Sequence, residues 1–339
     1  MKRLLFGFAL LCSTSSWADN TFAIEDFTIK AGEEKEVDLI MYNDVTFTAF
    51  QLELELPDGV SVKYDDDEEA YCVVNAGRLL NAHVITSQYQ TSGSFKIMVY
   101  HNANKNLKGN SGSAVLTLTL VASDQVVTGS VTPAITNMEM TAYNSTTQET
   151  TKYKPENTSY NCTTQIVTTV TTLGYASFSW PKALDFTNSE LTAFIATTCD
   201  RSNLYLEPVT KVPANTGLIL KGTAGSENTY SLETTDETTD DVSGNLLSSN
   251  TTDVYTVASD DIYVLSNLDD GQPGFYRAAR GIQVGQYRSY LQYSFSGARM
   301  GLRFDEGTTA IVDNFQEIKH NNRYYNLQGQ RVNKTSKGI

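Results

Sequence analysis

The feature that most constrains this sequence is a two-residue hydrophobic period, which is clearest in residues 49–59, AFQLELELPDG. Successive side chains of a β-strand point to opposite faces, so strict alternation predicts a strand with one buried face. The buried face would carry Phe50, Leu52, Leu54 and Leu56, and the exposed face Gln51, Glu53 and Glu55. A Pro-Asp-Gly turn at 57–59 would end the strand.

The same period recurs in residues 36–44 (EVDLIMYND), 94–102 (SFKIMVYHN) and 112–123 (GSAVLTLTLVAS). Short alternating strands between Gly, Asn and Asp turns are typical of an antiparallel sandwich rather than of βαβ units. Thr, Tyr, Ser and Val are abundant, which favours strands over helices. We therefore predict an all-β chain of two antiparallel, jelly-roll-like β-sandwich domains joined by a Thr-rich linker.

The chain of 339 residues is long enough for two domains. Residues 141–165, TAYNSTTQETTKYKPENTSYNCTTQ, lack sustained alternation, which predicts an exposed connector. Alternation returns at 175–180, and the apolar run 218–220 predicts a fully buried strand. We expect a signal peptide at 1–18, a first sandwich at 19–143, a linker at 144–168, a second β-rich domain at 169–313 and a C-terminal tail at 314–339.

The first residues have the pattern of an export signal. Lys2 and Arg3 precede the apolar run LLFGFALLC at 4–12, and a small residue suitable for cleavage follows at Ala18. The run is too short for a transmembrane helix. We expect cleavage after Ala18 and export to the cell exterior or outer surface, or to the periplasm if the C-terminal tail does not sort the protein.

Charge and cysteine content exclude some classes of function. The 39 Asp and Glu residues outnumber the 25 Lys and Arg residues, giving a net charge of −14, which disfavours nucleic-acid binding. The spacing of Cys72, Cys162 and Cys199 fits neither a metal knuckle nor a dense disulfide framework. We expect them to be small buried hydrophobic residues, with at most one bridge, so the cores must stabilise the domains.

The first domain resembles a known family in the order of its segments: FTIKAGEEKEVDLIMYN (27–43), FTAFQLELELPDGVSV (47–62), GRLLNAHVITSQ (77–88) and the two strands within 94–123. This order is similar to that of cohesin modules. The resemblance implies a jelly-roll sandwich that binds a partner on one sheet face. In cellulosomes that partner is a dockerin, and related sandwiches bind polysaccharide.

The C-terminal half resembles a different group of proteins. DIYVLSN (261–267), GFYRAARG (274–281) and RSYLQY (288–293) follow an order similar to a β-rich domain near the C-terminus of many exported proteins of gut Bacteroidetes. The tail RYYNLQGQRVNKTSKGI (323–339) resembles their sorting or surface-attachment tails. It ends without the last strand of that pattern, so we expect a shortened tail. The resemblance implies no catalytic residue.

Motifs for catalysis or cofactor binding are absent from the sequence. His83, His101 and His320 form no metal-ligand spacing, and neither a G-x-S-x-G elbow nor a phosphate-binding Gly-rich loop occurs. We expect no cofactor and no enzyme. A polysaccharide-active enzyme would need two convergent carboxylates, which sequence spacing cannot select among 39 acidic residues.

The acidic run Asp65-Asp66-Asp67-Glu68-Glu69 is the sharpest charge feature. Packed oxygen ligands could hold calcium, but the run has neither the alternating ligands nor the central Gly of an EF-hand loop. Neighbouring residues of an extended chain point in opposite directions, which favours a solvated loop over a metal site.

Aromatic and charged side chains suggest binding surfaces. Tyr287, Tyr290, Tyr293 and Phe295 lie close together in the sequence and suit either packing or stacking on sugars. If the first domain binds as cohesins do, its partner-facing sheet includes the third strand. The alternation then places six residues on the binding face: Gln51, Glu53, Glu55, Lys96, Met98 and Tyr100.

These observations favour an exported, non-catalytic protein that docks a dockerin-like protein or a polysaccharide through a sheet face. A structural cell-surface or fimbria-like spacer is the alternative, and a polysaccharide-active enzyme comes third.

Overall fold

The computed structural model describes residues 20–200, 202–266, 273–294 and 297–304, and the backbone of 324–325 and 331–332. All regular structure in these residues is β-strand, which confirms the predicted all-β class. The strands are β1 (Thr21–Ala23), β2 (Phe27–Lys30), β3 (Glu34–Tyr42), β4 (Ala49–Leu54), β5 (Val60–Val62), β6 (Tyr64–Asp65), β7 (Ala70–Tyr71), β8 (Val73–Asn75), β9 (His83–Tyr89), β10 (Phe95–His101), β11 (Ser113–Ala122), β12 (Gly129–Val131), β13 (Ala134–Asn144), β14 (Glu149–Tyr153), β15 (Thr158–Ser159), β16 (Cys162–Val170), β17 (Tyr175–Phe178), β18 (Leu184–Asp185), β19 (Thr192–Cys199), β20 (Asn203–Val209), β21 (Lys211–Val212), β22 (Leu218–Lys221), β23 (Asn228–Thr234), β24 (Leu247–Asn250), β25 (Tyr255–Thr256), β26 (Ile262–Ser266), β27 (Gly274–Arg277), β28 (Gln283–Val284), β29 (Arg288–Gln292), β30 (Arg299–Phe304), β31 (Tyr324–Tyr325) and β32 (Arg331–Val332).

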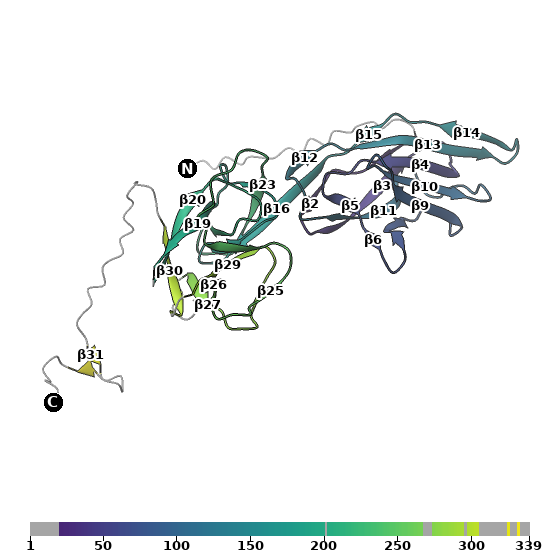
Figure 1. The fold of residues 1–339 in the computed structure, drawn as a ribbon. Coiled ribbons are helices and arrows are strands. Elements are labelled where there is room, and N and C mark those ends of the chain that lie inside the picture. Colours follow the sequence, from purple (N-terminus) through teal and green to yellow (C-terminus); the bar gives the residue numbers. More distant parts are fainter. Residues whose placement is uncertain are drawn as a thin grey trace, which may run out of the picture.

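Two sheets face each other in the N-terminal lobe, which we define as residues 20–159 (Figure 1). One sheet has the order β1-β3-β11-β5, with β8 also paired to β11. The other has the order β14-β13-β4-β10-β9, with β15 also paired to β13. The predicted period explains this packing, because alternate residues of β3, β4, β10 and β11 are buried between the sheets.

The turn predicted at 57–59 forms as expected. The Val60 amide donates to the Pro57 carbonyl over 2.9 Å. Gly59 has a φ of +80°, and a Cβ there would lie 2.7 Å from the Val126 backbone nitrogen. Only glycine combines this left-handed conformation with such a close backbone approach.

The segment 144–168, predicted as an exposed linker, contains regular structure. This segment contains β14, β15 and most of β16, and β16 buries every second residue. Two of those buried positions are Thr164 and Thr168, so the alternation is not visible as hydrophobicity. Thr164 can be buried because its hydroxyl donates to the Val127 carbonyl, which satisfies a group that burial would otherwise penalise.

The C-terminal lobe, residues 171–304, is built around a nine-stranded sheet that nearly closes into a barrel (Figure 1). Its order is β17-β22-β19-β20-β30-β27-β26-β29-β24, and β17 also lies close to β29. The predicted buried run at 218–220 is confirmed as β22.

The two lobes are joined by shared structure. Strand β16 pairs in parallel with β2 and antiparallel with β12 and β23. One hydrophobic core continues from Phe22 in the first lobe to Leu232 in the second. At the joint, the Thr128 amide donates to the Thr234 hydroxyl over 3.0 Å, and the Thr234 amide donates to the Thr128 hydroxyl over 2.8 Å. Strand β16 therefore serves both lobes.

The remaining expectations concern both ends of the chain. The signal peptide and its cleavage point after Ala18 lie outside the described residues. In the tail, β31 and β32 pair antiparallel, and the rest of 314–339 lies outside the described residues. Within the part of the chain that the structure describes, no helix is long and apolar enough to cross a membrane.

Candidate functional site

The six predicted binding residues can be placed on the sheet that contains β4 and β10. Strand β10 pairs antiparallel with β4, which sets Lys96 opposite Glu53 and Met98 opposite Gln51. Their neighbours Leu52, Leu54, Ile97 and Val99 are buried in the core. Because parity then turns Gln51, Glu53, Lys96 and Met98 outward, they lie together on what we call the outer face, the solvent side of β13, β4, β10 and β9.

The other two predicted residues lie at the margins of this group. Tyr100 shares the parity of Met98 and pairs with Val84 on β9. Glu55 follows the last residue of β4, and its carboxylate accepts a hydrogen bond from the Ala134 amide over 3.2 Å. The structure thus places five residues on the strands of one face and the sixth just beyond the end of β4.

Glu53 and Lys96 are the two charged residues of the outer face on β4 and β10. The Glu53 carboxylate accepts a hydrogen bond from the Ser94 hydroxyl over 2.8 Å. Lys96 takes part in no ion pair among the described residues. Both charges are therefore available to a partner.

Sequence reasoning missed a second charged group on this face. Glu139 of β13 lies opposite Gln51 and forms ion pairs with Lys152 at 2.7 Å and Lys154 at 3.7 Å. The hydrogen bond from Lys152 is the main reason that the pKa of Glu139 lies below its usual value. Lys152 and Lys154 lay in the presumed connector, so only recognition of β14 as a strand could have found them.

A depression of about 290 Å³ lies on the outer face over β9 and β10. It is lined by Thr86, Ser87, Gln88, Lys96 and Met98. Met98 is 38% exposed, which is unusual for a large apolar side chain in the middle of a strand. The arrangement offers an apolar contact beside a free ammonium group.

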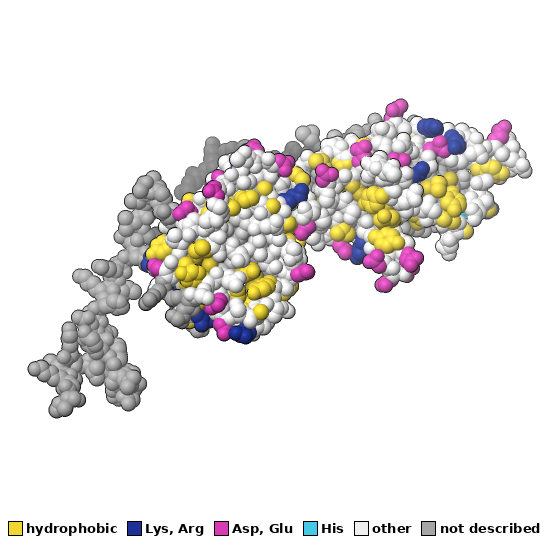
Figure 2. All heavy atoms as spheres, in the orientation of Figure 1, with side chains coloured by type: hydrophobic (Ala, Val, Ile, Leu, Met, Phe, Trp, Pro, Cys, Tyr) yellow, Lys and Arg dark blue, Asp and Glu magenta, His cyan; other side chains and the backbone are white. Residues whose placement is uncertain are grey.

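The acidic run lies in a hairpin whose turn, residues 66–69, is exposed to solvent, as expected for a solvated loop. Strands β6 and β7 pair antiparallel, and the turn between them projects from the lobe with its acidic side chains outward (Figure 2). The Asp65 carboxylate accepts hydrogen bonds from the Asp67 and Glu68 amides at 2.9 and 3.2 Å, so it caps the turn. No group of three or more His, Cys, Asp or Glu side chains among the described residues is arranged to hold a metal.

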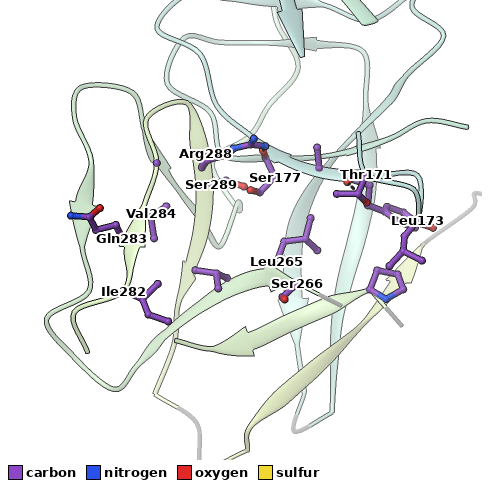
Figure 3. A pocket seen from close by; sticks show the side chains of 15 residues that line it. Thr171, Leu173, Ser177, Leu265, Ser266, Ile282, Gln283, Val284, Arg288 and Ser289 are labelled. Carbon is purple, nitrogen blue, oxygen red and sulfur yellow. Dashed lines mark hydrogen bonds between the residues drawn. The ribbon is translucent and has the colours of Figure 1, made fainter. Parts of the chain in front are cut away.

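A pocket of about 390 Å³ lies in the C-terminal lobe (Figure 3). Leu173, Leu265 and Val284 contribute apolar walls, and Arg288 and Gln283 contribute polar groups. Among the described residues that line it there is no Asp, Glu, His or Cys. These described lining residues supply no acid–base pair of the kind that glycoside hydrolysis requires.

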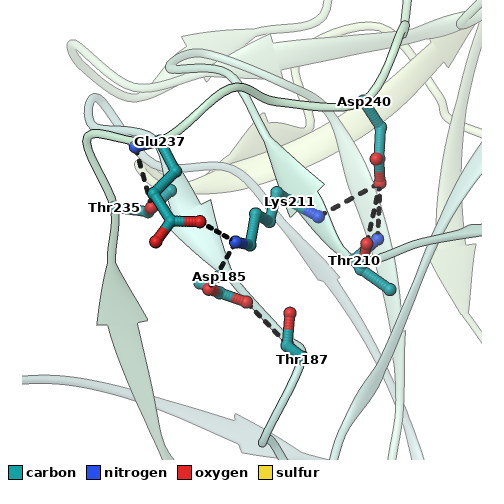
Figure 4. A network of polar contacts seen from close by, with 7 residues as sticks. All are labelled: Asp185, Thr187, Thr210, Lys211, Thr235, Glu237 and Asp240. Carbon is teal, nitrogen blue, oxygen red and sulfur yellow. Dashed lines mark hydrogen bonds and ion pairs between the residues drawn. The ribbon is translucent and has the colours of Figure 1, made fainter.

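Lys211 organises a polar network in the same lobe (Figure 4). Its ammonium contacts Glu237 and lies 3.6 Å from Asp185. The Asp240 carboxylate accepts hydrogen bonds from the Thr210 and Lys211 amides at 2.7 and 3.1 Å, which lower its pKa. Asp185, Glu237 and Asp240 each have a partner within the protein, so the network fastens the acidic loop at 235–241.

Two of the clustered tyrosines are used for packing. Tyr287 packs on Trp180 with ring centroids 4.4 Å apart, and Tyr290 stacks on Tyr255 at 4.9 Å. Tyr293 is 39% exposed, and Phe295 lies outside the described residues. These contacts account for Tyr287 and Tyr290 without a sugar.

No protein-family model matches the sequence, and no curated protein matches it. About 43% of the chain is structurally similar to solved cohesin domains. A non-cellulosomal cohesin from the hyperthermophilic archaeon Archaeoglobus fulgidus matches with a TM-score of 0.31 and 15% identity, over 43% of this chain and 91% of that one. The seventh ScaB type I cohesin from Pseudobacteroides cellulosolvens matches at 0.33 and 12%, over 43% and 92%. The chain from a type I cohesin–dockerin complex of Clostridium thermocellum matches at 0.32 and 10%, over 43% and 99%.

Proposed function

We propose that this chain is an exported, non-catalytic binding protein whose N-terminal lobe, a jelly-roll sandwich of the cohesin type, docks a dockerin-like protein partner through the outer face. The observation that carries the proposal is that an exposed Met98 lies on the same face as the charged side chains of Lys96 and Glu53, on adjacent strands. The order of segments that resembles cohesins adds the expectation that a sheet face is used.

The composition of the outer face favours a protein partner over a polysaccharide. Glu53 and Lys96 can form charged hydrogen bonds across an interface, and Met98 can fill a small apolar pocket. Sugar binding relies on flat aromatic rings. Of the six predicted residues only Tyr100 has such a ring, and it is half-buried.

Affinity capture with matched baits tests this proposal. The full chain, immobilised, is exposed to exported proteins of the source organism, beside the variants Glu53→Lys and Glu36→Lys. Glu36 is the matched control because it is an exposed strand glutamate on β3, in the opposite sheet. We expect a protein retained by wild type and by Glu36→Lys, and lost at least tenfold with Glu53→Lys.

Two results would count against this docking function. Equal retention by Glu53→Lys and Glu36→Lys would move the contact away from the outer face. Capture of no protein, together with no retention on a glycan array, would leave the lobe without a binding role. Retention on glycans alone would indicate that the lobe binds polysaccharide instead of a protein.

A structural spacer at the cell surface is a second candidate, favoured by the way the lobes are joined. Because β16 belongs to sheets in both lobes and one core crosses the joint, the lobes form a stiff unit suited to holding other domains apart. Regular polymers seen by electron microscopy of the exported protein, with no captured partner, would support this candidate.

Export and attachment complete the proposal. Residues 1–18 would direct export, the unit 19–143 would form the docking sandwich, the unit 169–313 would form the second β-rich domain, and the tail 314–339 would hold the protein at the outer surface. Protease treatment of intact cells tests this placement, since a surface protein is cleaved and a periplasmic one is protected. A polysaccharide-active enzyme remains the third candidate and is tested by activity on a polysaccharide panel.

A further inference from the structure

Strand β9 forms one edge of its six-stranded sheet and differs from the opposite edge strand β14 (Figure 1). Natural edge strands are usually protected by charges, prolines or bulges, which prevent pairing with another chain. Strand β14 follows this rule, with Glu149 and Lys152 in the strand and Lys154 just after it. Strand β9 reads HVITSQY and has none of these devices.

The hydrogen-bonding groups of β9 can be assigned from its hairpin with β10. The Gln90 amide donates to the Ser94 carbonyl over 2.8 Å, and the strand register pairs Gln88 with Lys96 and Thr86 with Met98. Alternate residues of an antiparallel strand point their backbone groups to opposite sides. The backbone groups of Thr86 and Gln88 therefore point toward β10.

The same alternation leaves Ile85 and Ser87 pointing away from β10. Among the described residues no strand pairs with this side of β9, and neither amide donates to any described group. Unpaired backbone donors and acceptors along an edge are a template for a further strand.

We propose that β9 pairs antiparallel with β9 of a second copy of this chain, joining two of these sheets across a two-fold axis at Thr86. In that register Ile85 of each copy pairs with Ser87 of the other, and each of these two pairs exchanges two backbone hydrogen bonds, about four in total. Outward-facing Val84 would lie opposite Gln88, and Thr86 opposite its own counterpart. The register is self-complementary, as an isologous interface requires.

Charge selects a second copy as the occupant. The chain carries a net charge of −14, so most surfaces of two copies repel each other. The stretch 79–95 is an exception, with no Asp, Glu, Lys or Arg. Burial and the neighbouring His101 hold the pKa of His83 below its usual value, so β9 is neutral at pH 7. Two copies of β9 can therefore approach without charge repulsion.

Pairing at this edge would leave the outer face open and extend it across two molecules. The inference does not depend on the proposed docking function, because it concerns the backbone edge of β9 and not the side chains of β4 and β10.

Sedimentation equilibrium over a wide range of protein concentrations tests the proposal, with Thr86→Lys as the disruptive variant. Two lysines would face each other at the axis, so we expect the wild-type mass to approach twofold at high concentration and the variant to stay monomeric. Thr150→Lys is the matched control, since Thr150 is an exposed threonine on edge strand β14 of the same sheet, and it should behave like wild type.

Disulfide trapping gives an independent positive readout. Residues opposite each other across a non-hydrogen-bonded antiparallel pair have Cα atoms about 4.5 Å apart, which a disulfide can span. Oxidised Thr86→Cys should give a covalent dimer, whereas Thr150→Cys and wild type should not. A wild-type protein that stays monomeric, or equal cross-linking of the two cysteine variants, would overturn the proposal. If β9 of a monomeric wild type bound an unrelated extended peptide, the proposal would also fail, because the occupant of the edge would not be a second copy of this chain.

Discussion

Replacing Ile166 by Ala tests the most consequential structural finding, that the segment predicted as a linker contains most of a buried strand shared by both lobes. Ile166 is fully buried in the middle of β16, opposite Leu232 of β23. The substitution removes three buried carbon atoms, which at about 0.8 kcal/mol for each gives about 2.4 kcal/mol. A residual cavity adds to this, so we expect the free energy of unfolding to fall by about 3–4 kcal/mol.

Chemical denaturation of a chain that begins at residue 19 supplies the measurement. Such a chain has Trp180 as its single tryptophan, because the other is Trp17. Trp180 is buried in the C-terminal lobe, so its fluorescence reports that lobe, while far-ultraviolet circular dichroism reports both. One shared core predicts coincident transitions by the two probes, displaced together in Ile166→Ala.

Val167→Ala is the matched control, since this neighbour points to the other face of β16 and is half-buried. It should cost about 1 kcal/mol or less. Equal small effects of both substitutions, or separate transitions for the two probes, would refute the assignment of β16 as a shared strand.

Three further predictions follow from individual residues. Gly59→Ala should lower the free energy of unfolding, measured by denaturation, by about 2 kcal/mol or more, and Gly32→Ala should lower it by about 1 kcal/mol. Both glycines have a positive φ, but only Gly59 lies against the backbone of another segment. Equal losses of stability would contradict this reasoning. Burial raises the pKa of the Cys162 thiol to about 11. At pH 8 this thiol should therefore react with a disulfide reagent far more slowly than the thiols of the partly exposed Cys72 and Cys199. Equal reaction rates would contradict the burial of Cys162. Hydrogen bonds from the Ser202 amide, the Tyr205 hydroxyl and Asn203 lower the pKa of Asp200 to about 2. The ionised carboxylate therefore stabilises the folded state above the unfolded pKa, and this stabilisation is lost as the pH falls toward 2. NMR titration should show a higher pKa of Asp200 in Tyr205→Phe, and an unchanged pKa would contradict the role of that hydroxyl.

The sequence predicted those elements whose buried positions are occupied by apolar residues. Leu52 and Leu54 of β4, and Ile97 and Val99 of β10, reveal their burial by composition alone. Parity then placed Gln51, Glu53, Lys96 and Met98 outward without knowledge of the register.

The sequence could not reveal β16 or the edges of the sheet. Thr164 is polar by composition and buried by virtue of a hydrogen bond to a backbone carbonyl distant in the sequence. The ion pairs of Glu139 depend on β14 folding back beside β13, which no local pattern indicates. Which strands pair is a property of the assembled sheet. The sequence therefore predicted only the β4 and β10 residues of the outer face, and the structure adds β13 and β9 to it.

The central claim, that the outer face binds a protein partner, is tested most directly through Met98. It is exposed, whereas Met41, Met138, Met140 and Met300 are buried, so its methyl group gives a surface probe among buried references. NMR of the chain labelled at its methionine methyl groups, titrated with a captured partner, should shift or broaden the Met98 signal and leave the buried methyl groups unchanged. A Met98 signal that stays fixed while the partner is bound at saturation would contradict the claim.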